Sequence, residues 1–343
     1  MFATYVHQLD PILFQFTESI ALRWYGLAYL AGFFLGYLVL KKLAEKKLWV
    51  LAPEKTADFI AAAALLGVFL GGRLGYILFY HIPRDGFGSV LADPMLVFRV
   101  WEGGMASHGG ILGLAIFTFW YARKHKVSWA GLADGLCVVG PIGLMCGRIA
   151  NFINGELYGR VAEKVAWAVK FPGAFMDPKV PESGRFDAAL SAAIDADPVF
   201  ANTIASIGGD GSQSGDRSAY FFSLLDANRH SEAVTNAIAP YLEGRHPSQL
   251  YEGFLEGGLI FAILLIVRLK YPKLPYGVIT GLFFALYATF RIFVEQFREP
   301  DAAWVVEGYL TQGQFLSFFL YIFAAVFFIT AWRGRGKPVV TGQ

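Results

Sequence analysis

The feature that most constrains this chain is a series of long apolar runs separated by short polar connections. A transmembrane helix needs about 20 consecutive, mainly apolar residues, and only 16% of the residues are charged, against about 25% in a soluble globular protein. The sequence therefore predicts an all-α polytopic membrane protein with about seven transmembrane helices. The runs lie near residues 20–40, 57–80, 109–122, 129–149, 248–267, 275–296 and 312–332, and the third is the shortest.

The distribution of basic residues predicts the orientation of these helices. Four short segments, at 41–47, 123–126, 268–273 and 333–337, contain thirteen of the 29 lysines and arginines. The short connections on the opposite side contain only Arg84, Arg99 and Arg298. Because basic loops stay in the cytoplasm, we expect the N-terminus outside and the C-terminus inside. No Lys or Arg precedes Arg23, so the basic start of a cleavable signal peptide is missing and we expect the first helix to be retained.

The region 160–245 is the least apolar part of the chain and is expected on the outer side. We divide the chain into helices 1–4 (1–159), an extracytoplasmic insert or small domain (160–245) and helices 5–7 (246–343). Within the insert, the pattern predicts two surface helices, a short strand and a flexible loop. These elements lie near 186–206, 219–242, 165–171 and 208–218, respectively. A poorly ordered loop over the whole insert is the alternative interpretation.

Strongly polar side chains interrupt the apolar run at 129–149. An arginine at the centre of a membrane helix costs about 2.5–3.5 kcal/mol on insertion scales. Arg148, Asn151 and Asn154 are nevertheless spaced i, i+3, i+6, which places them within a helix sector of roughly 120°. Glu156 follows directly. The spacing predicts a polar face at the outer end of this helix.

A second polar stripe lies in the sixth apolar run. Tyr287, Arg291 and Glu295 are spaced i, i+4, i+8 and drift by only about 80° around the helix. Glu252 and Glu256 form a similar i, i+4 pair in the fifth run. Two arginines at one depth in a bilayer favour an anion ligand, since guanidinium matches phosphate geometry.

Structural explanations remain open for each arginine. Arg291 with Glu295 can neutralise each other along the helix, and Arg148 with Glu156 can clamp a helix end. Arg73 lies in "GGRLG", where small residues are typical of close helix packing.

His108 lies in the glycine-rich stretch "EGGMASHGGILG" at 102–113. A lone histidine is more often a hydrogen-bonded structural residue than a catalyst. However, its flanking glycines let a backbone approach a ligand closely, and histidine can accept a proton near neutral pH. We therefore keep His108 as a candidate base.

The sequence lacks the motifs that several other classes of enzyme require. The chain has no HExxH, GxSxG or Walker A motif, and its six histidines are scattered. Cys137 and Cys146 are nine residues apart on one predicted helix, so they face opposite ways and cannot pair. We expect no metal site and no cofactor.

"GRIANFINGELYGR" (147–160) closely resembles the signature of the bacterial prolipoprotein diacylglyceryl transferases. Five further segments resemble that family in the same order, and only about 172–240 lies outside the resemblance, longer than usual. These segments are "LRWYGLAYL" (22–30), "GGRLGYILFY" (71–80), "EGGMASHGGILG" (102–113), "RHPSQLYEG" (245–253) and "YATFRIFVEQFREPD" (287–301). The family usually has glycine where this chain has Ala150, a mild change that we do not expect to abolish activity.

The resemblance implies transfer of the diacylglyceryl group of phosphatidylglycerol to the lipobox cysteine of prolipoprotein signal peptides. sn-Glycerol 1-phosphate is released, and no metal or soluble cofactor is implied. The location implied is the bacterial inner membrane, among membrane lipids, with the active site toward the outer leaflet. We expect no nucleic-acid partner. A phospholipid or anion transporter without chemistry is the alternative function.

The candidate site combines residues found from spacing with residues carried over from the family. The expected catalytic residues are His108, Arg148 and Arg291. Arginines would stabilise charge on the leaving phosphate, and His108, or else Tyr25 or Tyr287, would accept the thiol proton. Tyr25 and Gly159 come from the resemblance alone. The expected substrate-binding residues are Tyr25, Arg73, Asn151, Asn154, Glu156, Gly159, Tyr287 and Glu295.

Overall fold

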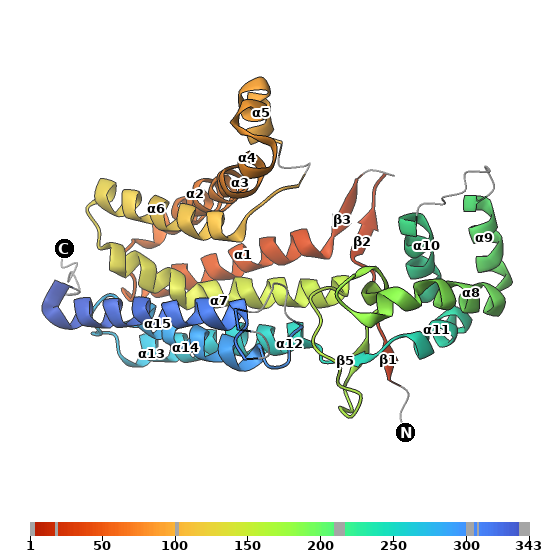
Figure 1. The fold of residues 1–343 in the computed structure, drawn as a ribbon. Coiled ribbons are helices and arrows are strands. Elements are labelled where there is room, and N and C mark those ends of the chain that lie inside the picture. Colours follow the sequence, from red (N-terminus) through yellow and green to blue (C-terminus); the bar gives the residue numbers. More distant parts are fainter. Residues whose placement is uncertain are drawn as a thin grey trace. The chain divides into compact units, whose positions relative to one another are not determined.

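The computed structural model describes residues 4–17, 20–99, 103–208, 217–299, 305–306 and 309–335, and most of them are helical (Figure 1). The chain forms two compact units, each assembled from three segments. Unit 1 comprises Met1–Tyr29, Leu144–Glu256 and Thr289–Ser317, and unit 2 comprises Leu30–Gly143, Gly257–Ala288 and Phe318–Gln343. The three-part division expected from the sequence stays a prediction.

Each of the seven predicted spans contains helix. The helices are α1 (Trp24–Glu45), α2 (Thr56–Ala62), α3 (Leu70–Tyr76), α4 (Ile82–Asp85), α5 (Phe87–Ala92), α6 (Ser107–His125), α7 (Trp129–Asn154), α12 (Ser248–Glu252), α13 (Ile260–Lys270), α14 (Val278–Val294) and α15 (Gln312–Thr330). π-helical stretches at Ala63–Phe69, Ile77–His81 and Gly253–Leu259 join several of them, and another, Ala331–Arg335, follows α15.

Five helices in the described part of the chain are long and apolar enough to cross a membrane, judged by length and composition. They are Trp24–Glu45, Pro53–Asp85, Trp129–Asn154, Ser248–Lys270 and Gln312–Gly334. α14 is apolar but has only 17 residues, and α6 is not among the five. The chain is thus a multi-pass helical membrane protein, while the count of seven and the orientation stay predictions.

Glycines bring α6 and the α2–α3 helix into close contact in unit 2 (Figure 1). A Cβ on Gly71 would lie 2.7 Å from Gly109 O and 2.8 Å from Gly113 Cα. A Cβ on Gly109 would lie 2.7 Å from Gly75 Cα. The prediction that "GGRLG" mediates close helix packing is confirmed. Gly109 beside His108 takes part in this packing, and the close approach of a ligand to these glycines stays a prediction.

A fully buried carboxylate ties three helices of unit 2 together. Asp134 on α7 accepts hydrogen bonds from Gly277 N (2.9 Å), Thr280 N (2.9 Å) and Thr280 Oγ1 (2.7 Å). Arg268 Nη2 on α13 donates to it over 3.1 Å. Asp134 therefore satisfies free N–H groups at the start of α14 and pairs with the buried Arg268.

The insert of unit 1 has a hydrophobic core of its own. Its helices are α8 (Phe186–Ala196), α9 (Pro198–Gly208), α10 (Arg217–His230) and α11 (Glu232–Ile238). Their buried side chains include Phe186, Leu224 and Ile238, and Phe171 and Phe175 pack in the same cluster. Each of the two predicted surface helices is therefore a pair of helices. Most of the predicted flexible loop at 208–218 lies outside the described residues.

Short strands connect the N-terminal segment to the insert. β1 (Tyr5–Val6) pairs in parallel with β4 (Val169–Lys170), which pairs antiparallel with β5 (Gly244–Arg245). β2 (Ile12–Gln15) and β3 (Ala21–Arg23) form a separate antiparallel pair. The strand predicted at 165–171 is confirmed, although it is only two residues long.

His7 follows β1 and is buried. Its Nε2 lies 2.7 Å from Phe152 O, and Asn228 Nδ2 donates to its carbonyl over 3.0 Å. Burial lowers the pKa of His7 from 6.5 to about 4, although the contact with Phe152 O opposes this shift. The histidine is therefore neutral at physiological pH.

Candidate functional site

Three arginines of unit 1 converge on one buried carboxylate, that of Glu252 at the end of α12. Arg148 Nη2 lies 2.5 Å from Glu252 Oε2, and Arg291 Nη1 lies 3.1 Å from the same oxygen. Arg298 Nη1 contacts both Glu252 oxygens, at 3.1 and 3.0 Å. Glu252 has no exposed surface. Arg148 and Arg291, which the sequence predicted to converge, therefore both contact Glu252, and a third arginine, Arg298, contacts it as well.

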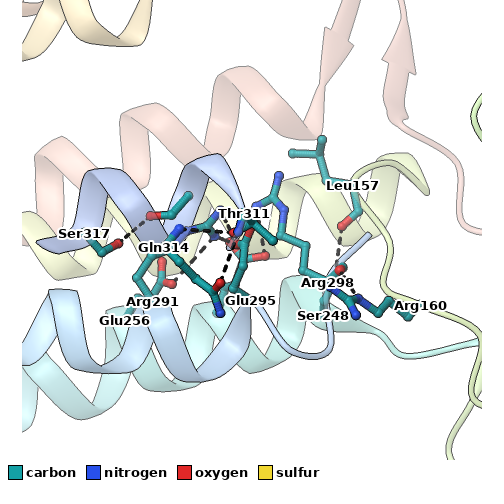
Figure 2. A network of polar contacts seen from close by, with 12 residues as sticks. Leu157, Arg160, Ser248, Glu256, Arg291, Glu295, Arg298, Thr311, Gln314 and Ser317 are labelled. Carbon is teal, nitrogen blue, oxygen red and sulfur yellow. Dashed lines mark hydrogen bonds and ion pairs between the residues drawn. The ribbon is translucent and has the colours of Figure 1, made fainter. Parts of the chain in front are cut away.

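Arg291 also contacts the other two glutamates of this cluster (Figure 2). Its Nη2 lies 2.8 Å from Glu295 Oε2, and its Nη1 lies 3.9 Å from Glu256 Oε1. Gly313 packs against Glu295, since a Cβ there would lie 2.9 Å from Glu295 Oε1. The structural Arg291–Glu295 pair considered from the sequence is therefore present, within a larger network. We name Arg148, Arg291, Arg298, Glu252, Glu256 and Glu295 the arginine–glutamate cluster.

A capping box positions the start of α15 beside Glu295. Thr311 Oγ1 accepts a hydrogen bond from Gln314 N, and Gln314 Oε1 accepts one from Thr311 N, both over 3.1 Å (Figure 2). This reciprocal pattern satisfies N–H groups at a helix start. It fixes the turn that carries Gly313.

The end of α7 extends the cluster toward Glu156. Asn151 accepts a 3.5 Å hydrogen bond from Arg148 Nη1 and donates to Glu156 Oε1 over 2.7 Å. Asn154 Nδ2 donates to the same Glu156 oxygen over 3.3 Å. The expected polar face is confirmed by these contacts. Asn151 lies between Arg148 and Glu156 and contacts both of them. These hydrogen bonds therefore do not form the direct Arg148–Glu156 clamp that the sequence left open.

Left-handed backbone conformations turn the chain back after α7. Gly155 and Leu157 have φ of 69° and 56°. Ser248 Oγ and Gln249 Nε2 donate to Leu157 O (3.1 Å) and Glu156 O (2.6 Å). Because Leu157 has a side chain that disfavours positive φ, these hydrogen bonds from the start of α12 hold the turn in place.

Gly159 occupies a position without space for a side chain. Its N–H donates to His246 O over 2.8 Å, and a Cβ would lie 2.7 Å from His246 Cβ and would also collide with Phe297 O. Next to it, Arg160 Nε donates to Arg298 O over 2.9 Å (Figure 2). Gly159 thus lets three segments approach one another and supports the backbone of Arg298.

A second buried arginine anchors the insert. Arg245 donates to both oxygens of Glu182, over 2.7 and 2.8 Å, and its guanidinium lies 5.2 Å from the ring centroid of Tyr158. Burial lowers the pKa of Arg245, but the Glu182 and Glu299 carboxylates together outweigh it and hold that pKa above its usual value. This pair is structural.

Arg73 and His108 belong to unit 2, so their placement relative to the arginine–glutamate cluster stays a prediction. Arg73 donates to Gly103 O, to Gly104 O over 3.0 Å and to Leu96 O over 2.6 Å. These contacts with backbone carbonyls favour the structural interpretation of Arg73. His108 is exposed in the first turn of α6.

The two tyrosines of the candidate site both contact neighbouring aromatic rings. Tyr25 lies in α1 with its ring 5.3 Å from that of Tyr29. Tyr287 lies one turn before Arg291 on α14, and its ring stacks on Phe283 at 5.9 Å. Their roles stay predictions.

Sequence reasoning missed Glu252 and Arg298 as site residues. The i, i+4 spacing of Glu252 and Glu256 was the sequence signal that could have identified Glu252 as a site residue. Arg298 was counted only as a basic residue of an outer connection, and its burial at 3% exposure could not be read from the sequence. Ala150 is also buried within α7, so its methyl group is accommodated.

The geometry defines a class of protein: a multi-pass helical membrane protein with a buried cluster of arginines at helix ends. In low-dielectric surroundings such donors bind anions and stabilise developing negative charge. The chain belongs to the prolipoprotein diacylglyceryl transferase family, whose model matches residues 11–330.

Curated relatives agree with this assignment. The chain is 35% identical over 343 residues to the phosphatidylglycerol–prolipoprotein diacylglyceryl transferases of Escherichia coli and of Shigella boydii serotype 18. In both comparisons the match covers 97% of this chain and 97% of the relative.

Proposed function

We propose that this chain is a transferase that moves the diacylglyceryl group of phosphatidylglycerol to a prolipoprotein. The convergence of Arg148 and Arg291 on Glu252 is the structural observation that carries the proposal. Family membership supports it, because the relatives are named for these two substrates. The acceptor is the thiol of the lipobox cysteine, and the site opens toward the outer leaflet of the inner membrane.

The reaction requires one bond to form and one to break. The cysteine sulfur attacks the terminal glyceryl carbon of the diacylglycerol, and the bond from that carbon to the phosphate oxygen breaks. Its electron pair remains on the phosphate of sn-glycerol 1-phosphate. The thiol proton must be removed because only a thiolate is nucleophilic enough.

Arg148 and Arg291 stabilise the charge that grows on the leaving phosphate. Arg148 has 20% of its side chain exposed, against 14% for Arg291 and 4% for Arg298, so it offers the largest accessible surface to a ligand. Arg298 instead holds Glu252 from the buried side. Asn151 orients Arg148 and contacts Glu156. The head group of the lipid binds beside them, at this end of α7.

His108 is the proposed base, with Tyr25 or Tyr287 as alternatives. Nearby guanidinium groups lower the pKa of a thiol by favouring the thiolate. A base of moderate strength is then sufficient. A His108→Gln variant that retains Arg148 and Arg291 separates proton removal from phosphate stabilisation: its rate should recover as the pH is raised toward the pKa of the thiol.

The proposal is tested with purified protein, phosphatidylglycerol and a synthetic signal peptide that contains a lipobox cysteine. Mass spectrometry should detect addition of one diacylglyceryl group to the cysteine peptide and none to a Cys→Ser peptide. Arg148→Ala should reduce turnover by at least about 100-fold, the effect of losing one donor to a developing oxyanion. Arg84→Ala, at a side chain with 69% exposure, is the matched control.

A transporter, the alternative function, would leave phosphatidylglycerol chemically intact. Membership of the transferase family does not favour it. Folded protein that binds the lipid but modifies no peptide, with all phosphatidylglycerol recovered, would overturn the transferase proposal.

A further inference from the structure

Unit 1 contains a cavity of about 670 Å³. The proposed transfer reaction does not by itself say which ligand this cavity binds. Its walls come from the N-terminal segment, the turn after α7, the segment 172–179 and helix α10. The volume falls within the range of about 300–1,000 Å³ that is typical of ligand sites. Apart from Asn154 at the end of α7, the lining residues lie outside the five candidate membrane helices.

The cavity adjoins the arginine–glutamate cluster. Asn154 and Glu156 form part of its wall, and Glu156 accepts the hydrogen bond of Asn151, whose amide oxygen faces Arg148. Two side chains, those of Glu156 and Asn151, therefore lie between a ligand in the cavity and Arg148. This continuity links the cavity to the proposed site of transfer.

Large apolar side chains line the cavity and remain exposed. Leu9 is 40% exposed, Leu157 37% and Phe222 66%. Exposed apolar patches with charged groups around them mark interaction sites. The charges have both signs, since Arg229 on α10 pairs with Asp10 (3.8 Å) and Glu156 lines the wall formed by the turn after α7. The ligand that fits carries apolar groups on a polar framework.

Of the two substrates, only one presents such groups outside the membrane. The acyl chains of phosphatidylglycerol remain in the bilayer, and its head group is a small polyol phosphate without apolar surface. The polypeptide that follows the lipobox cysteine has apolar side chains on a hydrogen-bonding backbone. Phe222, whose ring lies 5.6 Å from that of the buried Phe221, provides aromatic surface for such side chains.

We propose that this cavity binds the first residues after the acceptor cysteine of the prolipoprotein. This inference rests on the proposed transferase function. Phe222 of α10 contacts an apolar side chain of the bound peptide, while Asn154 and Glu156 accept or donate hydrogen bonds at its cysteine end. The insert thereby contributes to recognition of the protein substrate, and α10 determines which sequences after the cysteine are bound well.

Two peptides test the proposal with full-length protein and phosphatidylglycerol. Both carry the same signal sequence and cysteine. The long peptide continues for six residues, whereas the short peptide ends as an amide directly after the cysteine. The wild-type protein should have a lower KM for the long peptide. Phe222→Glu should raise the KM for the long peptide about tenfold and so remove most of this difference.

Val199→Glu is the matched control, because Val199 is 75% exposed on α9 and does not line the cavity. It should retain the wild-type preference. Leu9→Asn, on another wall, should weaken binding of the long peptide in the same direction. Equal KM values for the two peptides in the wild-type protein, or equal effects of Phe222→Glu on both, would overturn the proposal.

Photo-crosslinking separates this proposal from the proposed function. A long peptide with a photoreactive residue three positions after the cysteine should label the segment 217–230 in the folded protein. Labelling without diacylglyceryl transfer would contradict the transferase function and leave the cavity as a peptide site. Transfer without labelling of this segment would refute the cavity proposal alone.

Discussion

Replacing Glu252 by glutamine should strongly destabilise the protein and abolish its turnover. The substitution keeps the shape of the side chain but removes the charge that faces Arg148 at 2.5 Å, Arg298 at 3.0 Å and Arg291 at 3.1 Å. Removing one partner of a buried ion pair costs about 3–5 kcal/mol. Arg291 keeps its contact with Glu295 at 2.8 Å. The loss therefore falls mainly on Arg148 and Arg298, and we expect the free energy of unfolding to fall by about 3–5 kcal/mol.

Chemical denaturation in detergent micelles, followed by tryptophan fluorescence, measures this change, and the peptide assay measures turnover. Glu54→Gln, at an exposed glutamate, should shift the free energy of unfolding by no more than about 0.5 kcal/mol. Glu252→Asp retains the charge at a shorter reach and should recover part of the stability. A Glu252→Gln protein with wild-type stability and turnover would refute the role assigned to this carboxylate.

Three further predictions follow from single positions. The pKa of His7 is about 4 in the folded protein and 6.5 in the unfolded chain, so the unfolded chain binds more protons between these values. Stability should fall by up to about 3 kcal/mol as the pH decreases from 6.5 to 4, and denaturation of a His7→Gln variant should lack this slope. Gly159→Ala should lower the free energy of unfolding by about 1–3 kcal/mol and reduce turnover, whereas Gly184→Ala, with nothing within 4 Å of its Cβ, should change neither. Asp134→Asn should cost about 3–5 kcal/mol in the same denaturation experiment, and the exposed Asp58→Asn should be neutral.

Local spacing was sufficient to predict the elements and one face of the site. The apolar runs predicted the positions of the helices, because helix length and hydropathy are properties of contiguous sequence. The i, i+3 spacing placed Arg148 and Asn151 on one helix face, where they contact each other, and the i, i+4 spacing allowed the Arg291–Glu295 ion pair that the structure contains. Such pairs are neighbours on any helix.

Partners contributed by distant segments could not be predicted in this way. Glu252 lies 104 residues from Arg148 and 39 from Arg291 along the chain, and only the packing of α12 between the ends of α7 and α14 brings them together. Arg298 follows the end of α14, so helix periodicity gives no information about its direction. The packing of Gly109 against Gly71 and Gly75 could not be predicted either, because the two segments were interpreted separately.

The contacts also explain how one cluster can be both structural and functional. Unpaired guanidinium groups this close would repel one another in low-dielectric surroundings, so three arginines require carboxylates to hold them before any substrate arrives. Glu252 and Glu295 supply negative charge at short distances from these guanidinium groups, and Glu256 lies farther away, 3.9 Å from Arg291. Arg298 is almost fully enclosed, whereas Arg148 retains accessible surface and a weak 3.5 Å hydrogen bond to Asn151. A phosphate that binds at Arg148 therefore meets a donor already oriented by its neighbours, and little reorganisation is needed as charge develops on the leaving oxygen.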